Sequence, residues 1–314
     1  GCQYQHIEYD EQLKWKKQQV IELLKFMAET DAPVNDIISS PVKYNYRSKI
    51  TPHFNKPKNG EIGPIGFQQF GRRSLIDIEF CKIAKEDINN TLKDIRHDIL
   101  NRSLSYKKGA TILIRSDHQK KIHTKADSIA EEMVGQVKFN FPAGSFFQNN
   151  PYILEKFTDH VRREAKSNHS RFLVDAYCGA GLFALTSAKS FDEVTGIEIS
   201  DDSILWAKKN LKENKINNVK FISGKIENIF SDIEYSSNET SVIIDPPRKG
   251  CSEDFLIQLF KFKPRKVVYV SCNPATQMRD LKLFIKNGYE LKRTQPFDLF
   301  PQTRHLECIM TLEI

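Results

Sequence analysis

Short apolar runs alternate with longer amphipathic segments from about residue 150 to the end of the chain. Alternation of this kind predicts a doubly wound, mostly parallel sheet with helices on both faces. We therefore expect an α/β fold whose larger, Rossmann-like part occupies residues 141–314. The apolar runs cover residues 171–175, 193–197, 220–222, 241–245, 266–271 and 309–313.

Residues 1–140 show a different pattern and predict a smaller, mixed α/β domain. Its first element is an amphipathic helix over residues 8–29. Prolines and glycines punctuate residues 41–80 densely, which predicts short strands and turns. A helix near 85–104 and a strand at 111–115 complete this domain. The apolar side chains that give the first helix its periodicity are Leu13, Val20, Leu23, Leu24 and Met27.

Composition narrows the class of protein. The apolar content of 39% and the charged content of 28% are typical of a folded chain and not of a disordered one. No apolar run approaches the ~18 residues of a membrane span, and no signal peptide opens the chain. Six cysteines without regular spacing argue against a disulfide framework, so we expect a reducing, cytoplasmic location. The formal net charge of +7, carried mostly by residues 1–140, permits nucleic-acid binding without requiring it.

The first strand of the predicted sheet leads into a glycine-rich loop. Residues 175–184 read DAYCGAGLFA, and the second strand ends at Glu198. Gly179 and Gly181 would let the backbone approach a ligand closely, and the Glu198 carboxylate would accept hydrogen bonds from ribose hydroxyls. The loop fits the dinucleotide pattern G-x-G-x-x-A as well as it fits a methyltransferase loop. This motif alone leaves NAD, S-adenosylmethionine and a plain tight turn open.

Two later strands each end in a polar residue close to a proline. Residues 241–248 read SVIIDPPR and residues 267–274 read VVYVSCNP, so Asp245 and Cys272 reach the same edge of the sheet. Hydride transfer has no need of these groups, whereas methylation of carbon 5 of uracil needs a nucleophile. That carbon becomes reactive only after a thiolate adds to C6, and a separate base must then remove the C5 proton. We predict Cys272 as the nucleophile, the alternative being a small buried cysteine at a strand end.

The last segment of the chain offers three candidates for the base. Residues 297–308 read FDLFPQTRHLEC and include Asp298, His305 and Glu307. Spacing alone does not choose among these three side chains.

These motifs resemble those of the RNA uracil-5-methyltransferase family of the RlmD/TrmA type, which are class I enzymes dependent on S-adenosylmethionine. Residues 271–276 (SCNPAT) match the family's nucleophile motif, and residues 300–307 (FPQTRHLE) match its closing motif. The resemblance runs over essentially the whole chain. It implies methyl transfer to C5 of a specific uridine in RNA through a covalent bond between Cys272 and C6 of uracil, with Glu307 as the proton acceptor.

The resemblance also implies contacts to S-adenosylmethionine. Residues 146–150 (FFQNN) are similar to the family segment whose glutamine contacts this cofactor. Two positions depart from the family pattern, with Leu182 where a polar residue often stands and Lys225 where a neutral or acidic side chain is common. The implied cofactor-binding residues are Gln148, Tyr177, Gly179, Gly181, Glu198 and Asp245.

The start of the chain resembles a further feature of the family. Residues 1–6 (GCQYQH) look like the end of a C-x-x-C segment that, with a later cysteine, holds a [4Fe–4S] cluster in RlmD-like members. Cys2 and Cys81 would be two of the four thiolates such a cluster normally takes. We expect the chain to be a fragment, with the other two cysteines and a small RNA-binding β-barrel upstream of Gly1. The remaining cysteines, Cys178, Cys251 and Cys308, are expected to pack as small hydrophobes.

Two segments that mix aromatic and basic side chains are candidate RNA contacts, at residues 44–49 and 67–73. Stacking and phosphate neutralisation together hold flexible RNA, although core aromatics beside solvated charges would give the same pattern. We predict RNA as the partner, with 23S rRNA favoured over tRNA, and a monomeric protein. The open alternatives are the same chemistry on tRNA, an NAD-dependent oxidoreductase, and a non-catalytic RNA-binding module. The predicted RNA contacts are Arg47, Lys49, Arg72 and Arg73.

Overall fold

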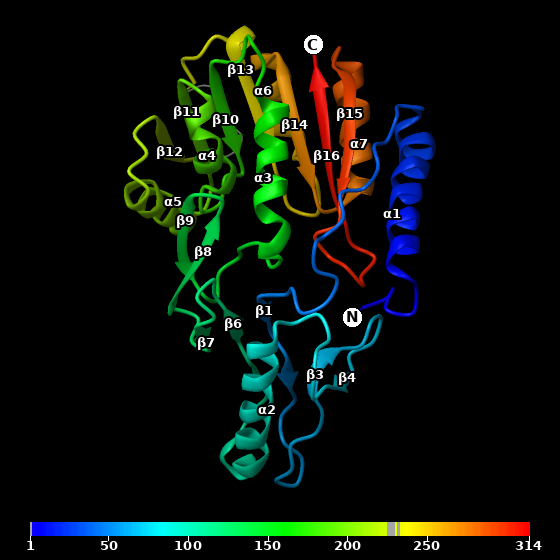
Figure 1. Cartoon of the computed structure of the whole chain (residues 1–314), viewed down its shortest axis with the longest axis vertical. Coiled ribbons are helices and arrows are strands. Elements are labelled where there is room, and N and C mark those ends of the chain that lie inside the picture. The colour runs from blue at the N-terminus through cyan, green and yellow to red at the C-terminus, as the bar shows by residue number, and fades with distance from the viewer. Residues whose placement is uncertain (1, 225–229, 231–232) are drawn as a thin grey trace.

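The computed structural model describes residues 2–224, 230 and 233–314. It consists of a larger α/β part and a smaller part, which lie at the top and the bottom of Figure 1. The parallel strands of the larger part point their carboxyl ends toward the smaller part. Loops at this edge are where a doubly wound sheet binds its ligands, so any such site lies between the two parts.

A seven-stranded sheet forms the centre of the larger part. Its order is β12-β11-β10-β13-β14-β16-β15, and β16 runs antiparallel to both of its neighbours. The chain leaves β10 toward one edge and later returns to β13 on the other side, so the switch point lies between β10 and β13. The strands are β10 (Phe172–Ala176), β11 (Glu193–Glu198), β12 (Val219–Ser223), β13 (Thr240–Ile244), β14 (Lys266–Ser271), β15 (Glu290–Phe297) and β16 (Glu307–Glu313).

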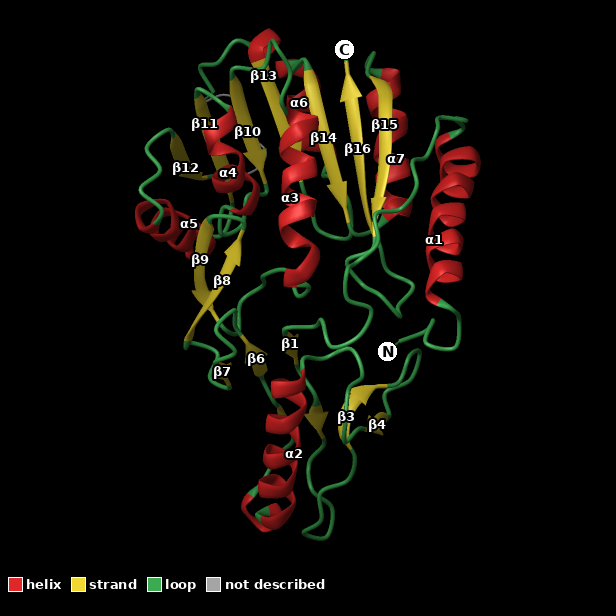
Figure 2. Ribbon diagram, viewed as in Figure 1, coloured by secondary structure: helices red, strands yellow, loops and turns green. Residues whose placement is uncertain are grey.

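Helices cover both faces of this sheet (Figure 2). Helices α3, α4 and α5 share one buried apolar cluster with the sheet, and α1, α6 and α7 share the other. Proline opens both α3 and α7, a position where its missing N–H leaves no bond unmade. The helices are α1 (Tyr9–Leu23), the π-helix η1 (Leu24–Ala28), α3 (Pro151–Ala165), α4 (Leu182–Ser187), η3 (Ala188–Ser190), α5 (Asp201–Glu213), η5 (Ser237–Glu239), α6 (Glu253–Phe262) and α7 (Pro274–Lys286).

The smaller part is one helix packed against short antiparallel strands. Helix α2 covers one face of a four-stranded sheet of order β4-β3-β2-β5, and a three-stranded sheet of order β1-β6-β7 lies beside it. Arg96 joins α2 to the four-stranded sheet, because it donates to both carboxylate oxygens of Asp77 at 2.9 Å and to Ile65 O at 2.7 Å. The elements are β1 (Lys49–Ile50), β2 (His53–Phe54), β3 (Ile65–Gln68), β4 (Leu75–Asp77), α2 (Glu86–Asn101), η2 (Ser103–Ser105), β5 (Ala110–Thr111), β6 (Ile114–Ser116) and β7 (Ile122–His123).

A hairpin of β8 (Ile129–Val134) and β9 (Val137–Pro142) connects the two parts. Its alternating side chains Phe139 and Phe141 are buried in the same cluster as the large sheet. The hairpin therefore packs with the larger part although most of it precedes residue 140. The division of the chain at that residue stays a prediction.

The first helix forms where the sequence predicts it, and its buried face includes only some of the apolar side chains that predicted it, Val20 and, in η1, Leu24. Tyr9, Gln12, Lys16 and Val20 are its buried residues, at the spacing of three to four that keeps one helical face inward. Of the leucines and methionine that suggested the helix, Met27 is exposed. Two polar side chains are buried because they meet polar partners from the end of the chain, described below.

The predicted α/β fold, a doubly wound sheet with a smaller mixed part, is confirmed. All six apolar runs of residues 171–313 are strands of the large sheet within one or two residues of their predicted bounds. Strand β15 was not predicted, because its sequence ELKRTQPF carries few apolar side chains. The strand expected at 111–115 is divided between β5 and β6, which belong to different sheets. None of the described helices is long and apolar enough to cross a membrane.

Candidate active site

Cys272 and Glu307 lie side by side at the carboxyl edge of the large sheet. Ser271, the last residue of β14, pairs with Cys308 of β16 in antiparallel register. The next positions outward are Cys272 and Glu307, so the register brings them opposite each other. Cys272 is partly exposed, whereas only 3% of Glu307 is exposed. The thiol can thus be reached from outside while the carboxyl group is held beneath the surface.

Asp245 joins this pair from the neighbouring strand. It directly follows β13, which pairs with β14 in parallel register. Burial raises the pKa of the Asp245 carboxyl to about 7. Burial and the nearby Asp245 carboxylate raise the pKa of Glu307 well above its usual value. Two carboxyl groups with raised pKa values therefore converge at this edge, a pattern typical of acid–base sites.

The Cys272 thiol is affected by the same charges. Burial, followed by the carboxylates of Glu307 and Asp245, raises its pKa to about 11, while the Arg248 guanidinium acts in the opposite direction. Asn273 is the N-cap of α7, so the positive end of that helix also lies next to the thiol and favours its ionised form. In this structure the thiol is protonated at neutral pH, and Arg248 is the nearby cation that stabilises a thiolate.

Hydrogen bonds from α7 fix the loop that carries Arg248. Asn273 Nδ2 and Thr276 Oγ1 donate to the Arg248 carbonyl oxygen at 2.9 and 3.2 Å. The buried Asp280 accepts from Cys251 N at 2.9 Å and from the Tyr269 hydroxyl at 2.6 Å. The loop after β13 and the turn after β14 are therefore held as one unit.

The glycine-rich loop lies at the switch point, after β10. Gly179 and Gly181 have φ angles of 53° and 91°, in the left-handed region that favours glycine. A side chain at Gly179 would meet open space, whereas one at Gly181 would come within 2.9 Å of Phe221. Gly181 is thus required for packing, and Gly179 borders a space that a ligand can enter.

Carboxylates surround this loop. Glu198 Oε2 accepts from Gly179 N at 3.2 Å, and its Oε1 accepts from Ile199 N at 2.9 Å. Asp175 Oδ2 accepts from Ala184 N at 2.8 Å, while its buried Oδ1 has no partner among the described residues. An acidic side chain beside an open glycine backbone fits a cofactor that carries a ribose.

The remaining predicted cofactor residues are Tyr177, in the same loop, and Gln148, on a segment that precedes it in the chain. Tyr177 follows β10 directly, has a φ of 66°, and packs edge-on against Phe255 at a centroid distance of 5.2 Å. Gln148 is 8% exposed and lies just before α3. Leu182 begins α4 and is partly buried, and Lys225 lies outside the described residues. These residues fit the donor set for S-adenosylmethionine, although the loop itself would also admit a dinucleotide.

The structure separates the three candidate bases. Asp298 is fully buried and forms an ion pair with Lys16 Nζ at 2.7 Å, so its charge is already matched. Burial and the cations Arg248 and Arg304 lower the pKa of His305. Glu307 is the candidate that lies beside Cys272 with a raised pKa. The partners of Asp298 were missed from the sequence, since a lysine on a helix is usually a solvated side chain.

The predicted cluster ligands are close together but too few. The Cys81 thiol contributes to the raised pKa of Cys2, for which burial is the main cause. Within the part of the chain that the structure describes, no group of three or more His, Cys, Asp or Glu side chains is placed to hold a metal ion. Two thiolates do not fit a [4Fe–4S] cluster on their own, so the structure does not support one. The prediction that the other three cysteines are buried is confirmed.

The four predicted RNA contacts divide into two pairs. Arg47 Nε donates to the Lys49 carbonyl oxygen at 2.9 Å, and Lys49 Nζ donates to Gly144 O at 2.8 Å, so both partly buried side chains bind backbone oxygens of the protein itself. Burial, with the charges of Arg115 and Arg47, lowers the pKa of Lys49 to about 8. Arg72 and Arg73 are exposed on the loop between β3 and β4. Tyr46, which precedes Arg47, is buried and its hydroxyl donates to Pro301 O at 3.0 Å, so it is unavailable for stacking on RNA.

Comparison with known proteins gives consistent matches. Residues 96–314 match the family model described as tRNA (uracil-5-)-methyltransferase. The chain is 45% identical over 333 residues to tRNA (uracil(54)-C(5))-methyltransferase of Schizosaccharomyces pombe and 37% identical over 386 residues to the protein of the same name of Saccharomyces cerevisiae. Both alignments cover 99% of this chain, which spans 63% and 60% of the length of these two relatives.

A solved structure matches nearly the whole fold. It is the Pyrococcus abyssi tRNA (uracil-54, C5)-methyltransferase in complex with S-adenosyl-L-homocysteine. The TM-score is 0.79 at 22% sequence identity, and the match covers 99% of this chain and 85% of that one. At this identity the match establishes a shared methyltransferase fold.

Proposed function

Because the chain belongs to the tRNA (uracil-5-)-methyltransferase family, we propose that it transfers a methyl group from S-adenosylmethionine to carbon 5 of a uridine in RNA. The membership itself was predicted from the motifs at residues 271–276 and 300–307 and is confirmed. The observation that carries the proposal is the placement of Cys272 beside Glu307 at the sheet edge that also holds the glycine-rich loop. An NAD-dependent oxidoreductase has no use for this pair.

Residues of this chain form the cofactor site in the proposal. When bound, S-adenosylmethionine supplies an electrophilic methyl group. The open backbone at Gly179 and the carboxylate of Glu198 support binding of its nucleoside portion. Asp245 lies between that loop and Cys272, where it can orient the cofactor and the base together. The proposed contacts are Gln148, Tyr177, Gly179, Gly181, Glu198 and Asp245.

Cys272 activates the uracil ring. Its sulfur forms a bond to C6, the C5–C6 double bond opens, and the negative charge spreads over C5 and the O4 oxygen. C5 then accepts the methyl group, and loss of the C5 proton expels the thiolate and restores the double bond. The target base must leave its stack to reach the thiol. Because the thiol has a pKa of about 11 without RNA, its ionisation must be favoured when the substrate binds, and Arg248 is placed to do so.

Glu307 is the proposed acceptor of the C5 proton. Its position opposite Cys272 places its carboxyl group next to the uracil ring that is bonded to the Cys272 sulfur. Its raised pKa makes it a stronger base than an exposed glutamate, which suits removal of a proton from carbon. Asp298 cannot take this role while it is ion-paired with Lys16.

We further propose that the RNA is a tRNA. The preference for 23S rRNA rested on the resemblance of Cys2 and Cys81 to cluster ligands, and the described residues do not support a cluster. Both curated relatives reported above are named as tRNA (uracil(54)-C(5))-methyltransferases, which supports the uridine at position 54 as the target.

Methyl-labelled S-adenosylmethionine and unmodified total RNA test the proposal, with tRNA and 23S rRNA separated after the reaction. The expected result is 5-methyluridine in the tRNA fraction, absent with Cys272→Ala and retained with Cys81→Ala, the matched change of another partly exposed cysteine. Label in 23S rRNA alone would contradict the choice of tRNA. No label in either fraction, from a protein that binds both donor and RNA, would contradict the proposed function.

A further inference from the structure

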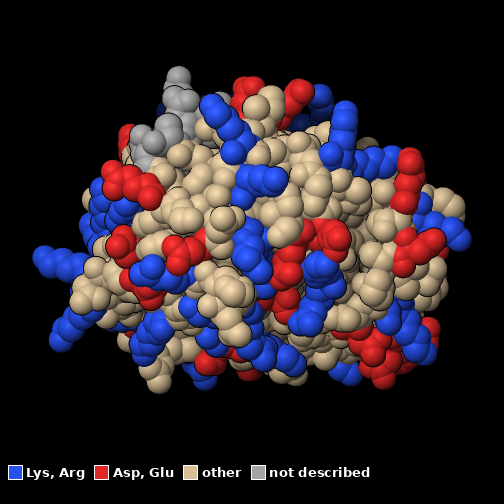
Figure 3. All heavy atoms as spheres, turned by 90° about the horizontal axis from the view of Figure 1, so that it is seen from above, with Lys and Arg blue, Asp and Glu red and all other residues tan. Residues whose placement is uncertain are grey.

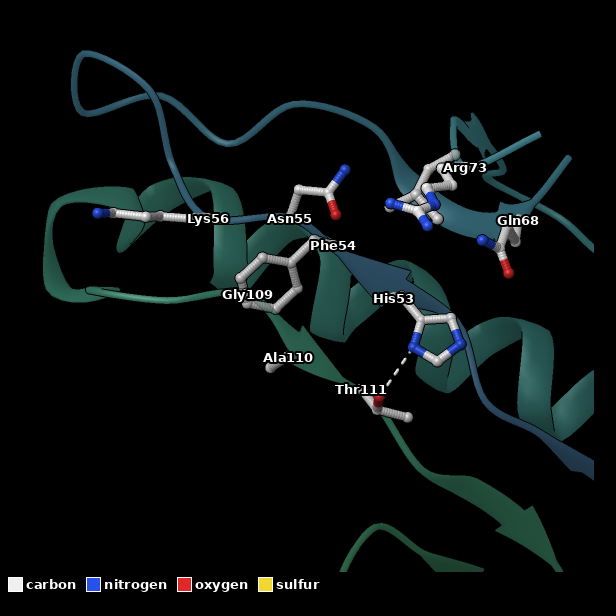
Figure 4. Close-up of a pocket in the computed structure, with 10 residues that line it drawn as sticks. His53, Phe54, Asn55, Lys56, Gln68, Arg73, Gly109, Ala110 and Thr111 are labelled. Carbon is white, nitrogen blue, oxygen red and sulfur yellow. Dashed lines mark hydrogen bonds between the residues drawn. The ribbon is translucent and has the colours of Figure 1, made fainter.

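A hollow of about 530 Å³ lies on the smaller part, away from Cys272 (Figure 4). It occupies the open face of the sheet of β2, β3, β4 and β5. The opposite face of this sheet is covered by α2, against which Phe54 and Ile65 are buried. Strand alternation turns His53, Gln68 and Thr111 to the uncovered side, where His53 Nδ1 lies 2.8 Å from Thr111 Oγ1.

The lining of the hollow is suited to a polyanion. Arg73 supplies a guanidinium group at one side, and Lys56 supplies an ammonium group at the opposite rim, where its side chain extends outward (Figure 4). Asn55, Gln68 and His53 add further side chains that can form hydrogen bonds. None of the ten lining residues carries a carboxylate. The end of the molecule farthest from this part instead shows basic and acidic side chains interspersed (Figure 3).

The hollow is connected to the catalytic edge by the loop between β3 and β4. This loop, residues 69–74, borders the hollow at Arg73 and carries Phe70, whose side chain is 74% exposed. The Arg304 guanidinium lies over the Phe70 ring at 4.9 Å from its centroid. Arg304 precedes Glu307 by three residues in the closing motif. An exposed aromatic ring beside an arginine, between the hollow and the catalytic edge, forms a platform on which a base can stack.

We propose that this hollow binds the phosphate backbone of the substrate RNA outside the segment that contains the target uridine. The inference rests on the proposed function, since it takes the RNA to be the one that Cys272 modifies. Lys56 and Arg73 neutralise phosphates, and the Phe70–Arg304 pair guides the strand from the hollow to the catalytic edge. Phosphate contacts of this kind position RNA and raise affinity without reading its sequence.

Binding of a labelled tRNA transcript tests this role independently of methylation. The double variant Lys56→Ala/Arg73→Ala is compared with Lys93→Ala/Lys286→Ala, which removes the same charge from exposed positions elsewhere. We expect the Lys56→Ala/Arg73→Ala variant to bind roughly ten-fold more weakly near 0.1 M salt. We also expect the slope of log K against log salt to become shallower by about one to two. The variant Lys56→Arg/Arg73→Lys, which keeps both charges, should restore most of the affinity.

Activity on two substrates gives the second readout. With the whole tRNA, the Lys56→Ala/Arg73→Ala variant should show a raised KM and an unchanged kcat. With a short hairpin around the target uridine, the same variant should match the wild type. Equal affinities and salt slopes for the hollow variant and the control variant would overturn the inference. So would an equal loss on the short hairpin, because that loss would place the two cations at the catalytic edge. If the wild type binds tRNA through the hollow yet transfers no methyl group, the inference stands while the proposed function fails.

Discussion

Gln12 and Gln302, which are 290 positions apart in the chain, hydrogen-bond to each other twice. Gln12 Nε2 donates to Gln302 Oε1 at 3.0 Å, and the Gln302 backbone N–H donates to Gln12 Oε1 at 3.0 Å. One turn further along α1, Lys16 Nζ donates to Asp298 Oδ1 at 2.7 Å and to Phe300 O at 3.2 Å. The first helix thereby fixes the loop that leads into Glu307.

The buried ion pair of Lys16 and Asp298 makes a first prediction. Lys16→Ala would leave the Asp298 carboxylate buried without its partner, because both side chains have no exposed surface. We expect the free energy of unfolding to fall by ~3–5 kcal/mol, measured by urea denaturation. Lys17→Ala removes the adjacent exposed pair with Asp36 and should cost less than about 1 kcal/mol. Equal costs for the two variants would show that the helix does not fix the catalytic loop through Lys16.

Arg248 is predicted to control the reactivity of Cys272. Its guanidinium lowers the pKa of a thiol that burial has raised to about 11. Arg248→Ala should raise that pKa further, leave less thiolate at any pH below it, and slow alkylation by iodoacetamide roughly three- to ten-fold. The rate is followed at Cys272 by peptide mass spectrometry between pH 8 and 10. Lys249→Ala, which removes the next cation along the loop, should leave the rate unchanged, and a similar slowing there would refute a specific role for Arg248.

Glu307→Gln should speed the alkylation of Cys272 that Arg248→Ala slows. The Glu307 carboxylate raises the pKa of Cys272, so its neutral amide should lower that pKa and speed alkylation at pH 9. The variant should at the same time be unable to complete methyl transfer. A faster-reacting thiol in an inactive enzyme is the expected combination. An unchanged alkylation rate would mean that the two groups are farther apart than the strand register places them.

Asp245 is predicted to lower stability at neutral pH. Burial raises its folded-state pKa to about 7, whereas an unfolded aspartate titrates near ~3.9. Between these two values the folded state binds more protons, so the contribution of this group to stability is present at low pH and is lost as pH rises toward 7. Asp245→Asn should therefore be more stable than the wild type at pH 8, by at most about 4 kcal/mol, and no more stable at pH 4. Thermal unfolding at the two pH values measures this, and a constant difference would contradict it.

The large sheet and the position of Cys272 at its carboxyl edge were predictable because their signals are local. Each strand of residues 171–271 carries apolar side chains within a short segment, as buried parallel strands require, and Cys272 directly follows one of these strands. The glycine loop likewise follows its strand directly. Resemblance of short motifs was then sufficient to select Glu307 from three candidates.

The polar contacts between distant segments were not predictable. Gln12 and Lys16 are side chains typical of a solvated helix face. Their burial is favourable only because residues 298–302 pack against them and supply polar partners. Strand β15 is likewise held by pairing with β16 and not by an apolar pattern of its own. The hollow of the smaller part depends on which faces of two-residue strands α2 covers, and strands that short carry no periodicity.

The covalent step between Cys272 and uracil is tested most directly by trapping it. Glu307→Gln is incubated with methyl-labelled S-adenosylmethionine and tRNA, and the label that stays with protein after denaturation in SDS is counted. Without a base to remove the C5 proton, a methylated protein–RNA complex should accumulate well above the wild-type level. The double variant Cys272→Ala/Glu307→Gln should form none. A labelled complex in the double variant, or 5-methyluridine made by Cys272→Ala alone, would contradict the assignment of Cys272 as the nucleophile.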